Sequence, residues 1–195
     1  MPSPASQSRS SPLPCWLVAA VMAAPTAFAG SELQASTTGE ALTRPATMVR
    51  QPERCVLLAA GRAGRRIVAV GERGVVAYSD DSGQQWRQAT VPSSVTLTAL
   101  RFADDRHGYA IGHGGTVLAT SDAGQTWVRR LDGRQIANIE LADAKGSGDI
   151  AAARAAERLA ADGPDKPLLD LVVFDARRLL VVGAYGLALV SDDGG

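Results

Sequence analysis

The sequence predicts an all-β fold built from a repeated unit of short strands. A motif of the form Ser/Thr-x-Asp-x-Gly occurs three times, beginning at Ser79, Thr120 and Ser191. Each copy follows two short apolar runs that are separated by a glycine-bounded turn. Short β-branched runs between turn signals are typical of strands, and a repeat of about 20–50 residues is typical of architectures such as the β-propeller.

The first two copies align without a gap and lie 41 residues apart. Residues 70–86 (VGERGVVAYSDDSGQQW) align with residues 111–127 (IGHGGTVLATSDAGQTW). The third copy, residues 182–195 (VGAYGLALVSDDGG), lies 71 residues after the second, and the sequence ends inside its turn. Four short strands in a unit of this length correspond to one propeller blade. We therefore predict a β-propeller with about 2.5–3 blades, an incomplete ring.

Each blade is predicted to contain a central hairpin flanked by two further strands. In the first copy, residues 67–70 and 75–78 are the hairpin strands, joined by a two-residue loop between Gly71 and Gly74. The flanking strands are expected at residues 97–102, 168–174, 86–89 and 127–131. The resulting partial propeller covers residues 55–195, with blades at about 55–91, 92–133 and 168–195.

The longer third interval predicts a helical insertion at residues 134–167. Asp149 is placed as the N-cap of an alanine-rich helix over residues 150–161, which Gly163 and Pro164 end. Residues 136–144 predict a second, weaker helix. Such an insertion is either a hairpin packed on the propeller or an element that binds a partner.

The N-terminus has the features of a secretory signal peptide over residues 1–29. Arg9 precedes an apolar stretch at residues 16–24, and Ala27-Phe28-Ala29 is a cleavage site of the A-x-A type. We expect an exported, periplasmic protein that begins near Gly30, with a lead-in segment at residues 30–54. Cleavage would remove Cys15. Cys55 would then have no partner for an internal disulfide and is expected to be a small buried residue.

The composition argues against nucleic acid as the partner. The formal net charge is zero, and all but Lys145 and Lys166 of the 20 basic residues are arginine. No basic run or patch stands out in the sequence. Hydrophobic residues make up 46% of the chain, which is enough to form a core.

The repeated motif has an explanation in the physics of turns. An aspartate or serine in a tight turn accepts hydrogen bonds from backbone amides one or two residues on, and the glycine supplies a position with positive φ. The tryptophan then begins the next strand and buries its ring. The residues with these structural roles are Ser79, Asp81, Gly83, Trp86, Thr120, Asp122, Gly124, Trp127, Ser191, Asp193 and Gly195.

These motifs resemble the Asp-box, or bacterial neuraminidase repeat, of sialidases and sortilin-type propellers. Residues 70–86, 107–127 and 179–195 are more similar to the photosystem II stability and assembly factor family and its relatives in non-photosynthetic bacteria. The resemblance implies a non-enzymatic scaffold that binds a protein partner and assists the assembly of an envelope or membrane protein. It implies no cofactor and no small-molecule substrate.

The alternative is a fragment of a sialidase-like glycoside hydrolase. Such an enzyme needs two carboxylates about 5–10 Å apart, whereas the acids here sit at equivalent turns of successive blades. The Arg-Ile-Pro motif of sialidases is absent, because Arg66-Ile67 is followed by Val68. His107 and His113 have no ligand cluster around them. We therefore predict no catalytic, cofactor or metal site.

Arginines in loops and at strand ends are the candidate partner-binding residues. Their guanidinium groups can bind an acidic segment, as the arginine-lined face of the resembling family implies; the alternative is that they are solvated loop residues. They are Arg62, Arg65, Arg66, Arg73, Arg101, Arg106, Arg129, Arg130 and Arg134. Propellers close with about 4–8 blades, so we also expect this sequence to be the first part of a longer propeller.

Overall fold

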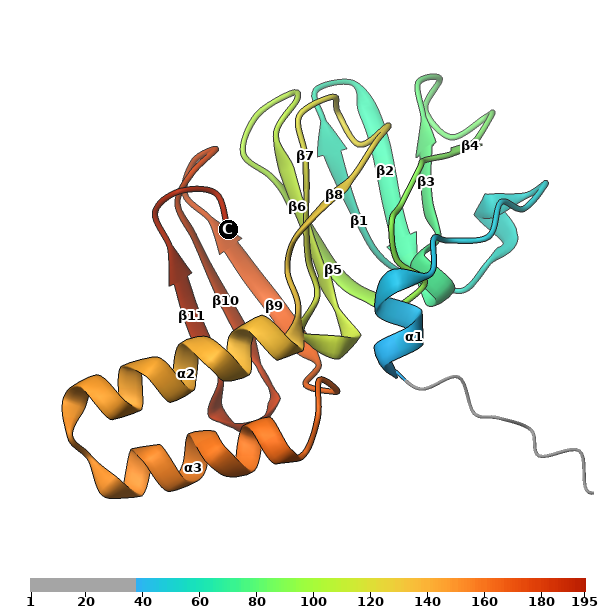
Figure 1. Ribbon diagram of the computed structural model, residues 1–195. Coiled ribbons are helices and arrows are strands. Elements are labelled where there is room, and N and C mark those ends of the chain that lie inside the picture. Colours follow the sequence, from blue (N-terminus) through green and yellow to red (C-terminus); the bar gives the residue numbers. More distant parts are fainter. Residues whose placement is uncertain (1–37) are drawn as a thin grey trace, which may run out of the picture. The chain divides into compact units, whose positions relative to one another are not determined.

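The computed structural model describes residues 38–195 (Figure 1). The predicted signal peptide, its cleavage site and Cys15 lie outside the described residues. No helix within residues 38–195 combines the length and the apolar character needed to cross a membrane.

The described chain forms three antiparallel sheets that follow one another in sequence (Figure 1). The first contains β1 (Leu57–Ala63), β2 (Arg66–Gly71), β3 (Val76–Ser79) and β4 (Arg87–Gln88) in that order. The second contains β5 (Leu97–Phe102), β6 (Gly108–Gly112), β7 (Val117–Thr120) and β8 (Val128–Leu131). The third contains β9 (Leu168–Val173), β10 (Leu179–Gly183) and β11 (Ala188–Ser191) in the order β11-β10-β9.

The sheets are arranged as consecutive propeller blades. The first strand of each sheet contacts the first strand of the next, β1 with β5 and β5 with β9. Each sheet then runs outward by successive hairpins, which is the strand order of a blade. The prediction of an all-β fold with propeller blades is therefore confirmed.

The hairpin loops differ from the predicted two-residue form. Each is a single turn of 3-10 helix, at η2 (Glu72–Gly74), η3 (His113–Gly115) and η4 (Ala184–Gly186). The residue in the middle of each turn is left-handed, with φ of 56° at Arg73 and 61° at Tyr185. The glycine before the turn is needed for close packing, because a Cβ on Gly71 would lie 1.9 Å from the carbonyl oxygen of Val56.

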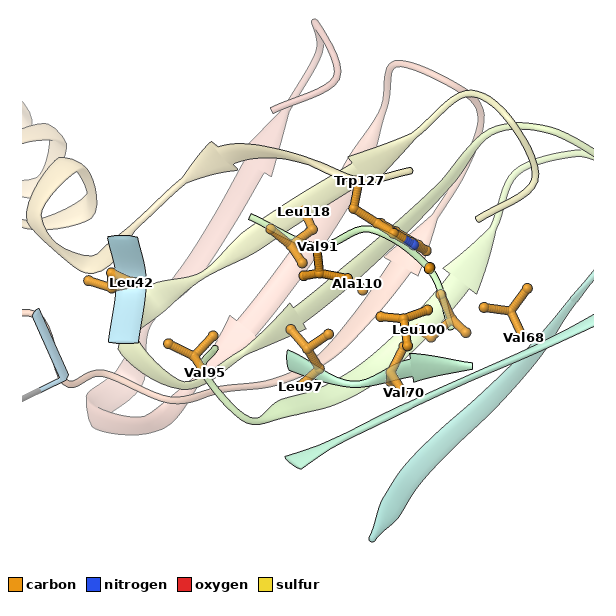
Figure 2. Packing of buried hydrophobic residues seen from close by; sticks show 12 residues of the cluster. Leu42, Val68, Val70, Val91, Val95, Leu97, Leu100, Ala110, Leu118 and Trp127 are labelled. Carbon is orange, nitrogen blue, oxygen red and sulfur yellow. The ribbon is translucent and has the colours of Figure 1, made fainter. Parts of the chain in front are cut away.

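Two apolar clusters fill the spaces between the sheets. Figure 2 shows the first cluster, in which Val68 and Val70 of β2 pack against Leu97 and Leu100 of β5. The lead-in segment contributes to it through α1 (Thr38–Thr43), whose Leu42 is fully buried. The second cluster joins the second sheet to the third. Burial of side chains from successive sheets is what holds the blades together.

The lead-in segment also includes η1 (Pro52–Arg54), which contacts β3. Cys55 follows η1 immediately and is half-buried, so the expectation that it is a buried core residue is wrong. Its position after a surface turn, outside the strands, explains the partial exposure.

Two antiparallel helices separate the second and third sheets. The second of them, α3 (Ile150–Ala161), has Asp149 as its N-cap, as the sequence predicted. The first, α2 (Gly133–Ser147), is longer than the predicted 136–144, because the Asp132 side chain and Gln135 form a capping box that begins the helix earlier. Ile136 anchors α2 in the second apolar cluster. The amide of Gly115 donates to the carbonyl of Lys166 at 2.8 Å, so the insertion is attached at the η3 end of the sheets.

Candidate functional site

The hydroxyl residue and the aspartate of each Asp-box form one hydrogen-bonded unit. The Ser79 hydroxyl donates to the Asp81 carboxylate at 2.8 Å and accepts the amide of Gly83 at 2.8 Å. Thr120 makes the same contacts with Asp122 and Gly124, at 2.8 and 3.0 Å. Ser191 repeats them with Asp193 and Gly195.

The aspartates bind amides farther along the chain than the sequence analysis expected. Asp81 accepts the amide of Gln85 at 2.8 Å, and Asp122 accepts the amides of Gln125 and Thr126 at 3.0 and 2.9 Å. The predicted reach of one or two residues is therefore too short. Two successive left-handed residues coil each turn, for example Ala123 and Gly124 with φ of 60° and 83°, and this coiling returns later amides to the carboxylate.

The two tryptophans lock the turns through their ring nitrogens. The Trp127 indole N–H donates to the carbonyl of Gly124 at 3.1 Å, and the Trp86 indole N–H donates to that of Gly83 at 3.0 Å. Trp127 is buried between the first and second sheets, whereas Trp86 is half-buried. Regular pairing begins one residue after each tryptophan, at Arg87 and Val128, because the Trp127 amide donates to Thr90 of the preceding sheet.

Several turn carboxylates ionise more readily than usual. Burial opposes ionisation of Asp122, but hydrogen bonds from Thr126, Thr120 and Gln125 outweigh it and lower its pKa. The backbone amides of His107 and Arg106 lower the pKa of Asp104 to about 2. The Arg178 side chain, with two backbone amides, lowers the pKa of Asp175 to about 2. These shifts arise chiefly from hydrogen bonds within turns.

A loss of stability in acid is the expected consequence of these lowered pKa values. Each carboxylate stabilises the fold above its unfolded pKa of about 3.9, and this contribution is lost as the pH falls through the lower folded value. Urea unfolding should therefore show stability falling between about pH 4 and pH 2. Because the cause is short-range hydrogen bonding, the loss should persist in about 1 M salt, where long-range charge repulsion is screened. A loss that salt abolishes would contradict this explanation.

The candidate arginines do not form a single face. Arg65, Arg66 and Arg106 lie in the turns between the first two strands of their sheets, at the same end as the Asp-boxes. Arg62 is on β1 close to that end. Arg73 lies in η2, at the opposite end of the sheet. The remaining candidates lie on strands or at the start of α2: Arg101 on β5, Arg129 and Arg130 on β8, and Arg134 on α2.

Three of the candidates are engaged inside the molecule. Arg66 binds Asp80 through two hydrogen bonds, at 2.6 and 3.0 Å, and its guanidinium carbon lies 4.6 Å from the centre of the Tyr78 ring. Arg101 of β5 pairs with Asp170 of β9 at 3.1 Å. Arg129 donates to the carbonyl of Leu42 and thereby fixes α1 on the second sheet. These side chains have structural partners, so they are weak candidates for binding a separate molecule.

An exposed arginine recurs at the equivalent position of all three sheets. These residues are Arg65, Arg106 and Arg177, and we call them the arginine row. Their spacings of 41 and 71 are those of the repeats. Each is followed by a basic residue that an aspartate neutralises: Arg66 by Asp80, His107 by Asp104 and Arg178 by Asp175.

Adjacent turns of the arginine row are in contact. A Cβ on Gly64 would lie 2.9 Å from the Asp105 carboxyl carbon, which places the first turn against the second. The Tyr109 hydroxyl donates to the carbonyl of Ala176 at 2.7 Å, which fixes the third turn on the second sheet. Arg177 was not among the predicted residues, although the 71-residue displacement from Arg106 would have identified it.

The histidines are placed as isolated residues. His107 contacts Asp104 at 2.8 Å, and His113 is exposed in η3. Within residues 38–195, no three histidine, cysteine, aspartate or glutamate side chains are placed to hold a metal ion together.

Comparisons with known proteins point to one family. Residues 79–151 match the family model described as "Photosynthesis system II assembly factor YCF48". Two solved structures are similar at 17% identity: "YCF48 bound to D1 peptide", with a TM-score of 0.49, and "YCF48 from Cyanidioschyzon merolae", with a TM-score of 0.48. They cover 71% and 72% of this chain, and the chain spans 38% of the length of each. No curated protein matches the chain.

The matched segment contains the Asp-boxes at Ser79 and Thr120 and the whole second sheet. The similarity predicted from the sequence motifs is therefore confirmed. In its Asp-box repeats, this chain resembles the photosystem II assembly factor family.

Proposed function

We propose that this chain is a non-enzymatic scaffold that binds an acidic segment of an envelope or membrane protein and assists its assembly. The observation that carries the proposal is the arginine row, Arg65, Arg106 and Arg177, which recurs with the repeats and is exposed in every sheet. The family match supports it, because the family is described as an assembly factor.

The chemistry of the row suits an extended acidic partner. Guanidinium groups bind carboxylates with two parallel hydrogen bonds, and three such groups on successive sheets present repeated sites along one edge. The neutralised second residue of each turn leaves one free positive charge at each site. A single exposed ion pair contributes about 0–1 kcal/mol, so recognition requires several of them together. Binding should accordingly weaken as salt is raised.

Export is part of the same proposal. The signal peptide features of residues 1–29 support a mature chain that begins near Gly30 and meets its partner in the periplasm. An assembly role for an envelope protein is consistent with that compartment.

The test compares two charge-matched triple variants as baits for solubilised envelope proteins. The first reverses the arginine row: Arg65→Glu, Arg106→Glu and Arg177→Glu. The control reverses three exposed arginines outside the row: Arg73→Glu, Arg134→Glu and Arg154→Glu. The first should bind the captured partner at least about tenfold more weakly, whereas the control should bind as the unmodified chain does.

The unmodified bait is isolated from the periplasmic fraction and its N-terminal residue is determined. Recovery of the bait only from the cytoplasm would remove export from the proposal. Equal capture by both triple variants, or capture of no envelope protein by the unmodified chain, would refute the binding role.

A further inference from the structure

An apolar cavity of about 450 Å³ lies between the second and third sheets. Its walls include Val117 and Leu131 of the second sheet and Val181 and Leu189 of the third. Ser191 to Gly195, the third Asp-box turn, forms one border. Binding sites for small ligands and side-chain anchors typically have volumes of about 300–1,000 Å³, so this cavity is large enough to hold a bulky side chain.

The repeat shows what fills the equivalent space between the first and second sheets. Trp127 occupies it, packed with Val76, Ala110 and Leu118 (Figure 2). The equivalents of those three residues, by the spacings of 41 and 71, are Val117, Val181 and Leu189. All three line the cavity. The walls that hold an indole ring in one interface are therefore present in the other.

The strand that carries the tryptophan also has a free position in the third sheet. In the second sheet, β8 pairs with the outer edge of β7, with Val128 opposite Ala119 and Arg129 opposite Leu118. The corresponding edge is that of β11, which pairs with β10 alone among the described strands. Unpaired backbone groups along such an edge can accept an additional strand.

We propose that the cavity and the edge of β11 together bind an extended segment of a partner polypeptide that carries a tryptophan. The indole ring fills the cavity, and the residues after it pair antiparallel with β11 as a fourth strand. By equivalence with β8, the first of these residues lies opposite Val190 and the second opposite Leu189. A charged side chain in place of the indole would be desolvated without a partner. This site is separate from the arginine row and does not depend on the proposed function.

The first experiment uses a labelled peptide with the sequence of residues 124–131, Gly-Gln-Thr-Trp-Val-Arg-Arg-Leu, and the full chain. The change in fluorescence anisotropy should show saturable binding. The same peptide with Trp127→Ala should bind at least about tenfold more weakly, since buried aromatic anchors dominate such interfaces. Equal binding of the two peptides, or no binding of the first, would overturn the proposal.

The second experiment changes the chain on either face of β11. Leu189→Lys places a charge in the cavity wall, and Ala188→Lys places the same charge on the neighbouring residue, which does not line the cavity. The first should lose at least about tenfold in peptide affinity and the second should not. Binding that is equal in the two variants would refute the site.

Hydrogen exchange on the unmodified chain gives a readout that does not require a variant to fold. Peptide binding should slow exchange at the amides of β11 and leave those of β1 unchanged. Unchanged exchange at β11 would contradict strand addition. Sedimentation identifies the other occupant: a concentration-dependent dimer that Leu189→Lys abolishes would assign the cavity to a second copy of this chain and overturn the proposal of a separate partner.

Discussion

Replacement of Trp127 by alanine should lower the free energy of unfolding by about 3–5 kcal/mol, the range measured for large aromatic residues in cores. The ring is 4% exposed and packs edge-on against Phe102, with 6.4 Å between the ring centres. Its indole N–H also closes the Asp-box turn through Gly124. The substitution therefore opens a cavity between two sheets and removes a hydrogen bond at the same time.

Trp86 provides the matched control, because it occupies the same position of the first Asp-box. Its ring makes the equivalent bond to Gly83 but remains half-exposed. We expect Trp86→Ala to cost about 1–2 kcal/mol, since less apolar surface returns to water. Urea unfolding followed by circular dichroism avoids the change in tryptophan fluorescence. Equal losses in the two variants would mean that burial between the sheets is not what Trp127 contributes.

The parts of the fold that local patterns determine were predictable from the sequence. The strand at residues 97–102 has the predicted bounds, because alternating apolar residues and a flanking turn define both of its ends. The helix at residues 150–161 likewise has its cap and its stop within a few residues. By contrast, the start of α2 depends on the reciprocal bonds of Asp132 and Gln135, a signal that the pattern of apolar residues does not contain.

The candidate site divides in the same way. Recurrence at fixed spacing is visible in the sequence, and it identifies Arg65 and Arg106 and would have identified Arg177. Which arginines are neutralised is not visible, because their partners are brought close by the fold. Arg101 pairs with Asp170 across two sheets, 69 residues away in the chain. Long-range ion pairs of this kind decide which charges remain available to a partner.

The four hydrogen bonds of the Asp122 carboxylate predict the second-largest effect of a single substitution. It accepts from the Gln125 and Thr126 amides and from the hydroxyls of Thr126 and Thr120, the last two at 2.6 and 2.8 Å. Because bonds to a charged acceptor contribute about 1.5–3 kcal/mol, Asp122→Ala should lower the free energy of unfolding by about 2–3 kcal/mol. Urea unfolding at pH 7 measures this loss.

Ser121→Ala is the control for the same turn, since the Ser121 side chain is exposed and its carbonyl is what Arg106 binds. It should change the stability by no more than about 0.5 kcal/mol. Asp122→Ala should also weaken the acid dependence, because one of the carboxylates with a lowered pKa is then missing and less stability is lost between about pH 4 and pH 2. If Asp122→Ala were as mild as Ser121→Ala, the turn would be held by its backbone alone, and the repeated aspartate would need an explanation outside folding.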